Sequence, residues 1–284
     1  MKTIVVPFDF SPNARTALAT ALHLAKATAS PVLVIHIVHE SPYKLAAATN
    51  EVEMNRLIRL SEEEQTTALQ LEIAEMQQGL SLKFHQGQVT AKAVYHPLIV
   101  EKIIALATEA DAGMIVMGTH GASGLKKVLF GSNTAHMIAR SSFPVLAIPA
   151  DYRWKTVEKI VYASDLEHLE SELKQLIPFA ISLNAVIELL HFDYGYNDKK
   201  ISVDQAENII RHSPYQFIHL QLCEGNLNKP LLRQLKAQLD ELKPDWLIMF
   251  TKEKSMWDKL FLGSHTEDMS QALPLPLLSF KKPE

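Results

Sequence analysis

Residues 114–134 read Met-Ile-Val-Met-Gly-Thr-His-Gly-Ala-Ser-Gly-Leu-Lys-Lys-Val-Leu-Phe-Gly-Ser-Asn-Thr, and the other segments of the chain can be placed relative to them. The apolar run at its start, residues 114–117, is typical of a buried parallel strand. The run ends at Gly118, and the loop that follows contains two more glycines, Gly121 and Gly124. Glycines in a loop that leaves a strand allow the backbone to come close to a ligand.

The far end of this stretch predicts the start of a helix. Ser132, Asn133 and Thr134 are residue types that cap helix N-termini, and apolar residues at helical spacing follow them. The first amides of a helix have no partner inside the helix, and the helix dipole places positive charge at the same end. Together with Gly131, which directly precedes Ser132, this end of the stretch favours binding of a phosphate.

The glycine spacing is more specific than the glycines alone. Two residues separate Gly118 from Gly121, nine separate Gly121 from Gly131, and Ser132 follows directly. This spacing resembles the ATP-binding signature of the universal stress protein family. It is not a Walker A loop, because no Gly-Lys-Ser/Thr sequence occurs in the chain, and the intervals do not fit the dinucleotide-binding fingerprint. An ordinary glycine-rich loop before a capped helix is the alternative.

Alternating apolar and amphipathic segments predict a doubly wound α/β fold for the first half of the chain. Ser11 is expected to cap the first helix, with Pro12 at its first position. In a sheet of order 3-2-1-4-5, the carboxyl ends of the first and fourth strands meet where ligands bind. The predicted strands cover residues 3–7, 31–38, 80–85, 114–117 and 143–148, and the predicted helices cover 13–27, 50–78, 97–110 and the segment after residue 134.

Asp9 directly follows the first predicted strand, so this topology places it beside the glycine loop. A carboxylate there can accept hydrogen bonds from ribose hydroxyls while the loop holds phosphates. A turn aspartate that caps local amides is the other interpretation of Asp9 taken alone. The carboxylate and the glycine loop together favour a nucleotide site.

The resemblance to universal stress proteins extends over the whole first half, through Val-Pro-Phe-Asp-Phe-Ser (6–11), Val-Ile-His-Ile-Val (34–38) and Ile-Val-Met-Gly-Thr-His-Gly (115–121). It implies a flavodoxin-like (adenine nucleotide α-hydrolase-like) domain. It also implies that Pro7 and Asp9 lie beside the nucleoside and that the backbone of Ile37 lies against the adenine. The residues that it implies around the ribose and phosphates are Gly118, His120, Gly121, Ala122, Ser123 and Gly124, with Gly131, Ser132, Asn133 and Thr134 completing the phosphate cradle.

The pattern restarts after a polar linker at residues 150–156, which indicates an internal duplication. Asp165 takes the place of Asp9, and His191 takes the place of His36. A Gly-Ser pair at 263–264 repeats the pair at 131–132 with an offset of 132 residues. We therefore predict two α/β domains, residues 1–150 and 151–284, each with a five-stranded parallel sheet of order 3-2-1-4-5 flanked by helices.

The second copy departs from the first in its loop. Phe250 stands at the place of Gly118, and Glu253 stands at the place of Gly121. A phenylalanine obstructs close approach of the backbone to a ligand, and a glutamate places a like charge beside a phosphate. We therefore expect the second domain to be degenerate for ATP, with a structural or regulatory role.

Composition limits the classes of protein. The chain has 284 residues, 47% of them hydrophobic and 21% charged, which suits a soluble globular protein. A net charge of -4 argues against nucleic acid as an obligate partner, and a single cysteine suits a reducing compartment. The segment after Lys2 lacks a signal-peptide pattern, and the longest apolar stretch, residues 32–38, is far too short for a membrane span. The cytoplasm is the expected location.

The histidines and the single cysteine do not form a recognisable metal or catalytic site. His36 and His39 lie on or near one strand without a cysteine pair, so ordinary placement is favoured over a zinc site, and no metal site is predicted. Cys223 is interpreted as a small core residue of a strand rather than a nucleophile. No general base accompanies the glycine loop, so catalytic residues are not assigned and ATP hydrolysis is expected to be slow at most.

The first interpretation is therefore a tandem universal stress protein that binds ATP, with or without Mg²⁺, in a nucleotide-dependent stress response or signalling role. The fifth strands of both halves are apolar edges, which predicts an internal pseudo-dimer, and a homodimer of the whole chain is also open. One rival is an ATP-using enzyme of the adenine nucleotide α-hydrolase-like group, although its Ser-Gly-Gly-x-Asp-Ser loop is absent after the first strand. The other rival is a scaffold without nucleotide.

Overall fold

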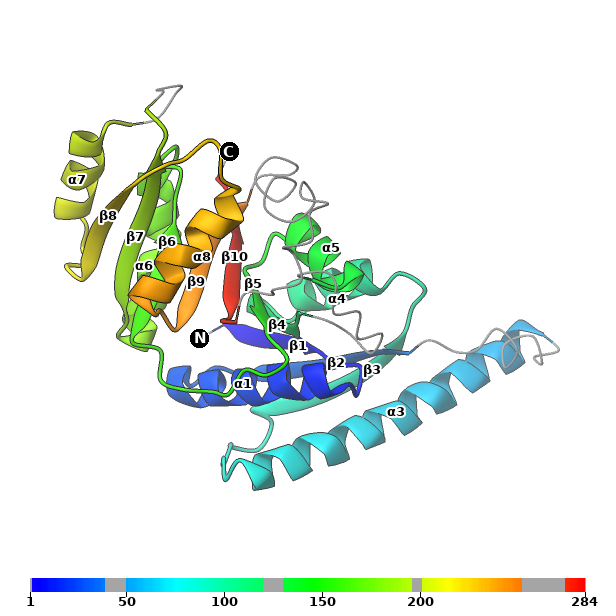
Figure 1. The fold of residues 1–284 in the computed structure, drawn as a ribbon. Helices are drawn as coiled ribbons and strands as arrows, with labels where there is room; N and C mark the ends of the chain where they lie inside the picture. The colour runs from blue at the N-terminus through cyan, green and yellow to red at the C-terminus, as the bar shows by residue number, and fades with distance from the viewer. Residues whose placement is uncertain (1, 39–49, 120–129, 196–200, 252–273, 284) are drawn as a thin grey trace. The chain divides into compact units, whose positions relative to one another are not determined.

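A computed structural model describes residues 2–38, 50–119, 130–195, 201–251 and 274–283 (Figure 1). The described residues form two compact units. Residues 2–38, 50–119, 130–137 and 145–154 belong to the first unit, and residues 138–144, 155–195, 201–251 and 274–283 belong to the second. Within this described part, no helix is both long and apolar enough to cross a membrane.

The first unit contains a sheet of five parallel strands in the order β3-β2-β1-β4-β5. Its central strand β1 has the buried sequence Ile4 to Val6 between two partly exposed ends, as expected for a strand covered on both faces. The strand order confirms the predicted 3-2-1-4-5 arrangement. The strands are β1 (Thr3–Pro7), β2 (Val32–Val38), β3 (Val89–Tyr95), β4 (Ala112–Gly118) and β5 (Val145–Ile148).

Helices cover both faces of this sheet: α1 and α3 lie on one face, and α4 and α5 lie on the other (Figure 1). The first helix begins as predicted, because the Ser11 side chain accepts a hydrogen bond from the backbone of Ala14 and Pro12 is the first helical residue. The helices are α1 (Pro12–Thr28), α3 (Glu51–Gly79), α4 (Ile99–Glu109) and α5 (Ser132–Arg140).

The third strand was predicted in the wrong place. Residues 80–85 are not a strand, because Leu80 is the C-cap of α3 and Ser81 has a left-handed backbone with φ of 55°. The strand at this position in the sheet is β3, whose residues alternate between partly buried and exposed at its start. An edge strand of this kind contains exposed Thr90 and Lys92 and lacks the continuous apolar run of a central strand.

The second unit repeats the same architecture. Its five parallel strands follow the order β8-β7-β6-β9-β10, which again corresponds to 3-2-1-4-5. The duplication predicted from the sequence is therefore confirmed at the level of topology. The strands are β6 (Lys159–Ala163), β7 (Val186–Asp193), β8 (Ile218–Glu224), β9 (Trp246–Thr251) and β10 (Leu277–Lys281).

The helices of the second unit are α6 (Leu169–Leu183), α7 (Val203–Arg211) and α8 (Leu231–Leu242). The helix between the second and third strands differs most between the units, since α7 has 9 residues and α3 has 29. The long helix in the first unit extends well past the sheet (Figure 1). This difference accounts for much of the shorter length of the second half.

Candidate functional site

A tight turn directly after β1 positions the predicted nucleoside-binding carboxylate. The Asp9 side chain accepts a hydrogen bond from the Ser11 amide (N to Oδ1, 3.1 Å), and Phe10 between them has φ of 61°. A left-handed backbone is unfavourable for a phenylalanine, so the surroundings must compensate. The Phe10 ring packs edge-on against Phe8 and His36, at centroid distances of 5.2 and 5.0 Å.

His36 fixes this turn to the neighbouring strand β2. Its Nδ1 lies 2.7 Å from the carbonyl oxygen of Phe8. Because a carbonyl oxygen can only accept, Nδ1 carries the proton and donates. The ordinary placement predicted for His36 is thus a structural one, while His39 lies outside the described residues.

The end of β2 offers a backbone edge beside this turn. Strand β1 pairs with β2 as far as Pro7 and Ile35, whereas β3 continues to pair as far as Val38. The edge of β2 that faces β1 therefore runs past the end of that strand at Ile37. Backbone groups in this position suit recognition of a planar base, as the family resemblance implies for Ile37.

Gly118 ends β4 where it meets the start of α1. A Cβ atom at Gly118 would lie 3.0 Å from the Asn13 carbonyl oxygen and 3.1 Å from its carbonyl carbon. Only a glycine allows this close approach without a shift of the backbone. The sequence indicated a close approach of the backbone here, and the neighbour that the structure shows is Asn13.

The segment after the glycine loop returns to the same strand end. The Gly131 amide donates to the Thr119 carbonyl at 2.7 Å, and the Thr134 hydroxyl donates to the Gly118 carbonyl at 2.8 Å. Thr134 is buried, whereas Ser132 and Asn133 are exposed at the first turn of α5. The Thr134 hydroxyl thus fixes α5 to β4, and Ser132 and Asn133 remain exposed to solvent.

The structure brings together the predicted residues at the ends of three adjacent strands, β2, β1 and β4. These residues are Pro7 and Asp9, Ile37, and Gly118, joined by Gly131 to Thr134 through the contacts with β4. The loop residues in between lie outside the described part of the chain: His120, Gly121, Ala122, Ser123 and Gly124. In the described part, no group of three or more His, Cys, Asp or Glu side chains is arranged to hold a metal ion.

The second unit contains the same turn and the same histidine bond. Asp165 accepts from the Glu167 amide at 3.0 Å, and Leu166 between them has φ of 64°. His191 Nδ1 lies 2.9 Å from the Ser164 carbonyl oxygen, which corresponds to the bond between His36 and the Phe8 carbonyl in the first unit. The duplication therefore extends to individual hydrogen bonds.

In the second unit, however, a lysine occupies this strand end. Lys282 Nζ donates to Asp165 Oδ2 at 2.5 Å and to Glu167 Oε2 at 3.1 Å, and it lies 3.9 Å from Glu172 Oε1. Its side chain is only 3% exposed. The lysine follows the last strand, where nothing in the sequence pattern distinguished it from a surface residue, and the sequence interpretation missed it.

Of the three carboxylates around Lys282, Glu172 is buried, whereas Asp165 and Glu167 are about one third exposed. Tyr162 donates to Glu172 Oε2 and also lies 3.0 Å from Ser164 Oγ. Burial, together with the neighbouring Glu172 carboxylate, raises the pKa of Tyr162 well above its usual value, and burial raises the pKa of Glu172. Burial lowers the pKa of Lys282, but its bonds to Asp165 and Glu167 outweigh this effect and raise it. The ammonium is therefore the counterion of this site.

Phe250 fills the remaining space at the end of β9. Its ring stacks on Phe280 at a centroid distance of 4.9 Å and meets Tyr162 edge-on at 5.6 Å. It is 4% exposed. The corresponding Gly118 has no side chain, and Asn13 lies directly beside it. Glu253, the other departure noted in the sequence, lies outside the described residues.

Solved structures with the same fold are known over the full length of the chain. A universal stress protein from Archaeoglobus fulgidus matches with a TM-score of 0.70 and 18% sequence identity, covering 98% of both chains. A putative universal stress protein from Pseudomonas aeruginosa matches with a TM-score of 0.58 and 15% identity, covering 99% of this chain and 93% of the other. Fold and site together define a tandem α/β protein with flavodoxin-like halves.

Sequence comparison identifies the family. The model of the universal stress protein family matches residues 1–149, and the chain belongs to this family. Two universal stress proteins of Methanocaldococcus jannaschii are 26% and 29% identical, each match covering 52% of this chain and 94% or 81% of the relative. The resemblance inferred from the glycine spacing is thus confirmed.

Proposed function

We propose that the first unit binds an adenine nucleotide, ATP, with or without Mg²⁺, at the carboxyl ends of β1, β2 and β4. The observation that carries this proposal is that three features lie at adjacent strand ends. They are the Asp9 turn, the edge of β2 at Ile37 and the start of α5, which Thr134 holds against Gly118. This is the switch point of the sheet, where doubly wound folds bind ligands. The glycine signature of the family supports the same site.

The proposed roles follow from the chemistry of each group. Asp9 accepts from the ribose hydroxyls, with Pro7 beside the nucleoside, and the backbone of Ile37 recognises the adenine. The accessible Ser132 and Asn133 at the start of α5 bind phosphate together with the N-terminal amides of that helix. Thr134 and Gly131 act by holding this helix end in place. The loop residues His120, Gly121, Ala122, Ser123 and Gly124 complete the phosphate site in this proposal.

We propose binding and signalling in a cytoplasmic stress response rather than catalysis. The described residues of the site offer hydrogen-bond acceptors and phosphate donors, and His36, the histidine beside the turn, is held by the Phe8 carbonyl. Enzymes typically turn over at roughly 1 to 1000 per second. A rate in that range, lost on substitution in residues 118–134, would instead establish the ATP-using enzyme.

The first test is direct identification of the bound ligand. The purified chain is denatured, and the released small molecules are measured by mass spectrometry. ATP or its hydrolysis product, in proportion to protein, is the expected result. Absence of nucleotide there, together with absence of ATP binding by the purified chain, would favour the scaffold without nucleotide.

The second test locates the site. Gly121→Glu introduces the charge that the second half carries as Glu253, so ATP should no longer raise the melting temperature of this variant. Gly79→Ala is a suitable control, because a Cβ atom at Gly79 would meet nothing within 4 Å. An equal ATP-dependent shift in a folded Gly121→Glu variant would rule out the assigned site.

We propose that the second unit does not bind ATP and has a structural or regulatory role. Lys282 supplies internally the positive charge that a ligand or metal would bring to Asp165, and Phe250 fills the end of β9. We also propose that residues 1–150 and 151–284 are the two domains and that they pair as a pseudo-dimer through their fifth strands. The isolated 1–150 fragment should then dimerise or aggregate in light scattering; a stable monomer with full ATP affinity would contradict this pairing.

A further inference from the structure

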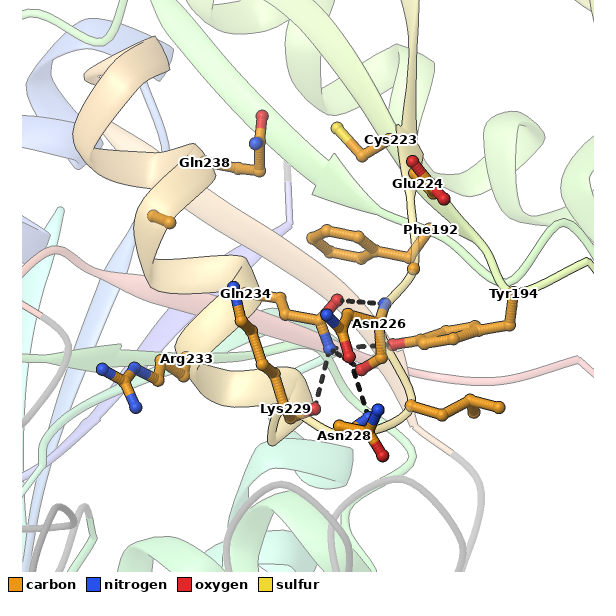
Figure 2. Close-up of a pocket in the computed structure, with 13 residues that line it drawn as sticks. Phe192, Tyr194, Cys223, Glu224, Asn226, Asn228, Lys229, Arg233, Gln234 and Gln238 are labelled. Carbon is orange, nitrogen blue, oxygen red and sulfur yellow. Dashed lines mark hydrogen bonds between the residues drawn. The ribbon is translucent and has the colours of Figure 1, made fainter.

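The second unit contains a cavity of about 730 Å³, broadly open to solvent, that is separate from the filled strand end at Lys282. It lies between α8 and the carboxyl ends of β7 and β8, with Phe192 and Cys223 on the strand side and Gln234 and Gln238 on the helix side (Figure 2). Sites for small molecules typically measure about 300–1,000 Å³. The cavity therefore has the size and the place, at the carboxyl ends of parallel strands, of a ligand site.

A buried glutamine holds one wall of this cavity in a defined conformation. Gln234 is 9% exposed, and its Oε1 accepts from the Asn226 amide at 2.8 Å. Its Nε2 donates to the carbonyl oxygens of Asn226 at 2.9 Å and Lys229 at 2.8 Å, and it reaches the Tyr194 hydroxyl at 3.5 Å (Figure 2). The loop before α8 is thus preorganised, which lowers the entropy cost of binding.

The same wall requires a glycine beneath an aromatic ring. A Cβ atom at Gly225 would lie 2.5 Å from Tyr194 Cδ1, so the ring rests directly on the backbone just after β8. Gly225 also donates its amide to the Asp193 carbonyl at 2.6 Å. Two contacts therefore position the Tyr194 ring at the edge of the cavity: the ring packs on Gly225, and the hydroxyl lies near Gln234.

Positive charge gathers at the helix end of the cavity. Lys229 and Arg233 both line it, and within the part of the chain described here neither side chain makes a hydrogen bond or an ion pair. They flank the first turn of α8, whose N-cap Pro230 provides no side-chain cap for the first amides. Two exposed cations beside the positive end of a helix dipole favour an anionic group.

The other residues that line the cavity indicate which chemical groups the rest of the ligand should carry. Phe192, Leu227 and Ala237 offer apolar surface, while Glu224 at the strand side disfavours a second negative charge. We propose that the second unit binds a small organic anion in this cavity, with one anionic group at the start of α8 and an apolar, ring-sized body against Phe192. The site lies toward the outer strands because Lys282 and Phe250 fill the strand ends at the centre of the sheet.

Cys223 provides a reporter for this cavity, because it lines the cavity and is the only cysteine of the chain. The probe is 8-anilinonaphthalene-1-sulfonate, which carries one anionic group and aromatic rings. The rate of Cys223 modification by an aromatic disulfide reagent is measured at mildly alkaline pH, with the probe varied and saturating ATP present throughout. ATP keeps the proposed nucleotide site of the first unit filled, so failure of either proposal can be seen separately.

At ten times its dissociation constant, the probe should slow Cys223 modification about tenfold. The double variant Lys229→Glu/Arg233→Glu should weaken this protection at least about tenfold. The control double variant Lys236→Glu/Arg211→Glu makes the same change of charge in the second unit, at residues that do not line the cavity, and should keep full protection.

Ala237→Phe, which adds an aromatic ring to the cavity lining on α8, is a second variant that should reduce protection without a change of charge. Circular dichroism establishes that each variant is folded. No protection in the native chain would overturn the proposal, and so would equal protection in a folded Lys229→Glu/Arg233→Glu or Ala237→Phe variant. If the charge variant does not fold, Ala237→Phe decides alone.

Discussion

Lys282 distinguishes the end of the first strand in the second unit from that in the first, because it places a positive charge beside the aspartate there. Both units build the same turn and present an aspartate at the end of the first strand, Asp9 in one and Asp165 in the other. In the second unit, the lysine lies within hydrogen-bond distance of that aspartate and of Glu167. A buried charge requires a partner, and here the partner belongs to the chain itself.

Removing this counterion should destabilise the protein strongly. Lys282→Met leaves three carboxylates near one another without a cation, and breaking a buried ion pair typically costs about 3 kcal/mol or more. Urea unfolding provides the measurement. Lys174→Met is the matched control, since Lys174 pairs with Glu170 on the surface of α6 and should leave the unfolding midpoint nearly unchanged. Equal midpoints for the two variants would contradict the assigned role of Lys282.

Asp245 gives the second unit an acid-sensitive contact. It accepts from the amides of Glu158 and Lys159 at 2.8 and 2.9 Å and pairs with Lys155 at 2.6 Å. Burial raises its pKa, but the Lys155 bond and the two amides outweigh this and lower it below the usual value. An acid with a lowered folded pKa contributes stability above its unfolded pKa of about 3.9 and loses it as the pH falls through the folded pKa.

Asp245→Asn should therefore cost stability at neutral pH and little at low pH. The expected difference from the native chain is about 1 kcal/mol at pH ~7, limited by solvent because the Lys155 side chain is 57% exposed. It should shrink as the pH is lowered from ~5 toward ~3. Unfolding curves at several pH values measure this difference, and a difference that is independent of pH would refute the assignment.

At the scale of elements, the long helix α3 protects an exposed sheet edge. Strand β3 is the outer strand of the first unit, and side chains of α3 accept from its backbone. Thr66 Oγ1 accepts from the Ala93 amide at 3.0 Å, and Glu62 Oε1 accepts from the Tyr95 amide at 2.7 Å. Covered edges resist pairing with other chains, so this helix protects the unit from aggregation.

Loss of these two bonds should destabilise the first unit. Glu62→Ala/Thr66→Val leaves both amides of β3 without these acceptors, at a cost of about 1–3 kcal/mol for each. Glu63→Ala/Thr67→Val makes the same chemical changes one residue further along, on the exposed side of α3. Thermal unfolding should separate the two double variants clearly. If both lose the same stability, helix propensity rather than edge capping explains the effect.

The elements were predicted where their signal is local. Ser11 and Pro12 indicated the start of α1 correctly, because a cap and its proline are adjacent in sequence. The third strand was misplaced, because β3 lacks a continuous apolar run and is held by its pairing with β2 and by bonds to Thr66 and Glu62, all distant in the chain. Cys223 was expected in the core and is only half-buried, since β8 is likewise an outer strand.

As with the helices and strands, only the parts of the candidate site in the first unit that depend on short motifs could be predicted from the sequence. The turn at Asp9 and the start of α5 follow from short motifs, and the structure brings them to adjacent strand ends. Two features depend on segments far apart in the chain, so no local sequence pattern predicted them. They are the contact between Gly118 and Asn13 and the burial of Lys282. Duplicated topology, in contrast, was visible because the repeats preserve their spacing.

In the whole molecule, the two halves share a fold but differ at their strand ends. Each unit has the same sheet order and the same histidine-held turn, yet only the first keeps a glycine at the end of its fourth strand. The second unit has Lys282 and Phe250 in the corresponding region and a separate cavity toward its outer strands.

The most direct test of this asymmetry is the number of ATP molecules that bind to one full-length chain. Isothermal titration calorimetry of the purified, nucleotide-free chain measures this stoichiometry together with the affinity. We expect one ATP per chain, no binding by Gly121→Glu, and unchanged binding by a folded variant with Lys229→Glu and Arg233→Glu in the second unit. Two ATP molecules per chain, or one that persists in folded Gly121→Glu, would contradict the account.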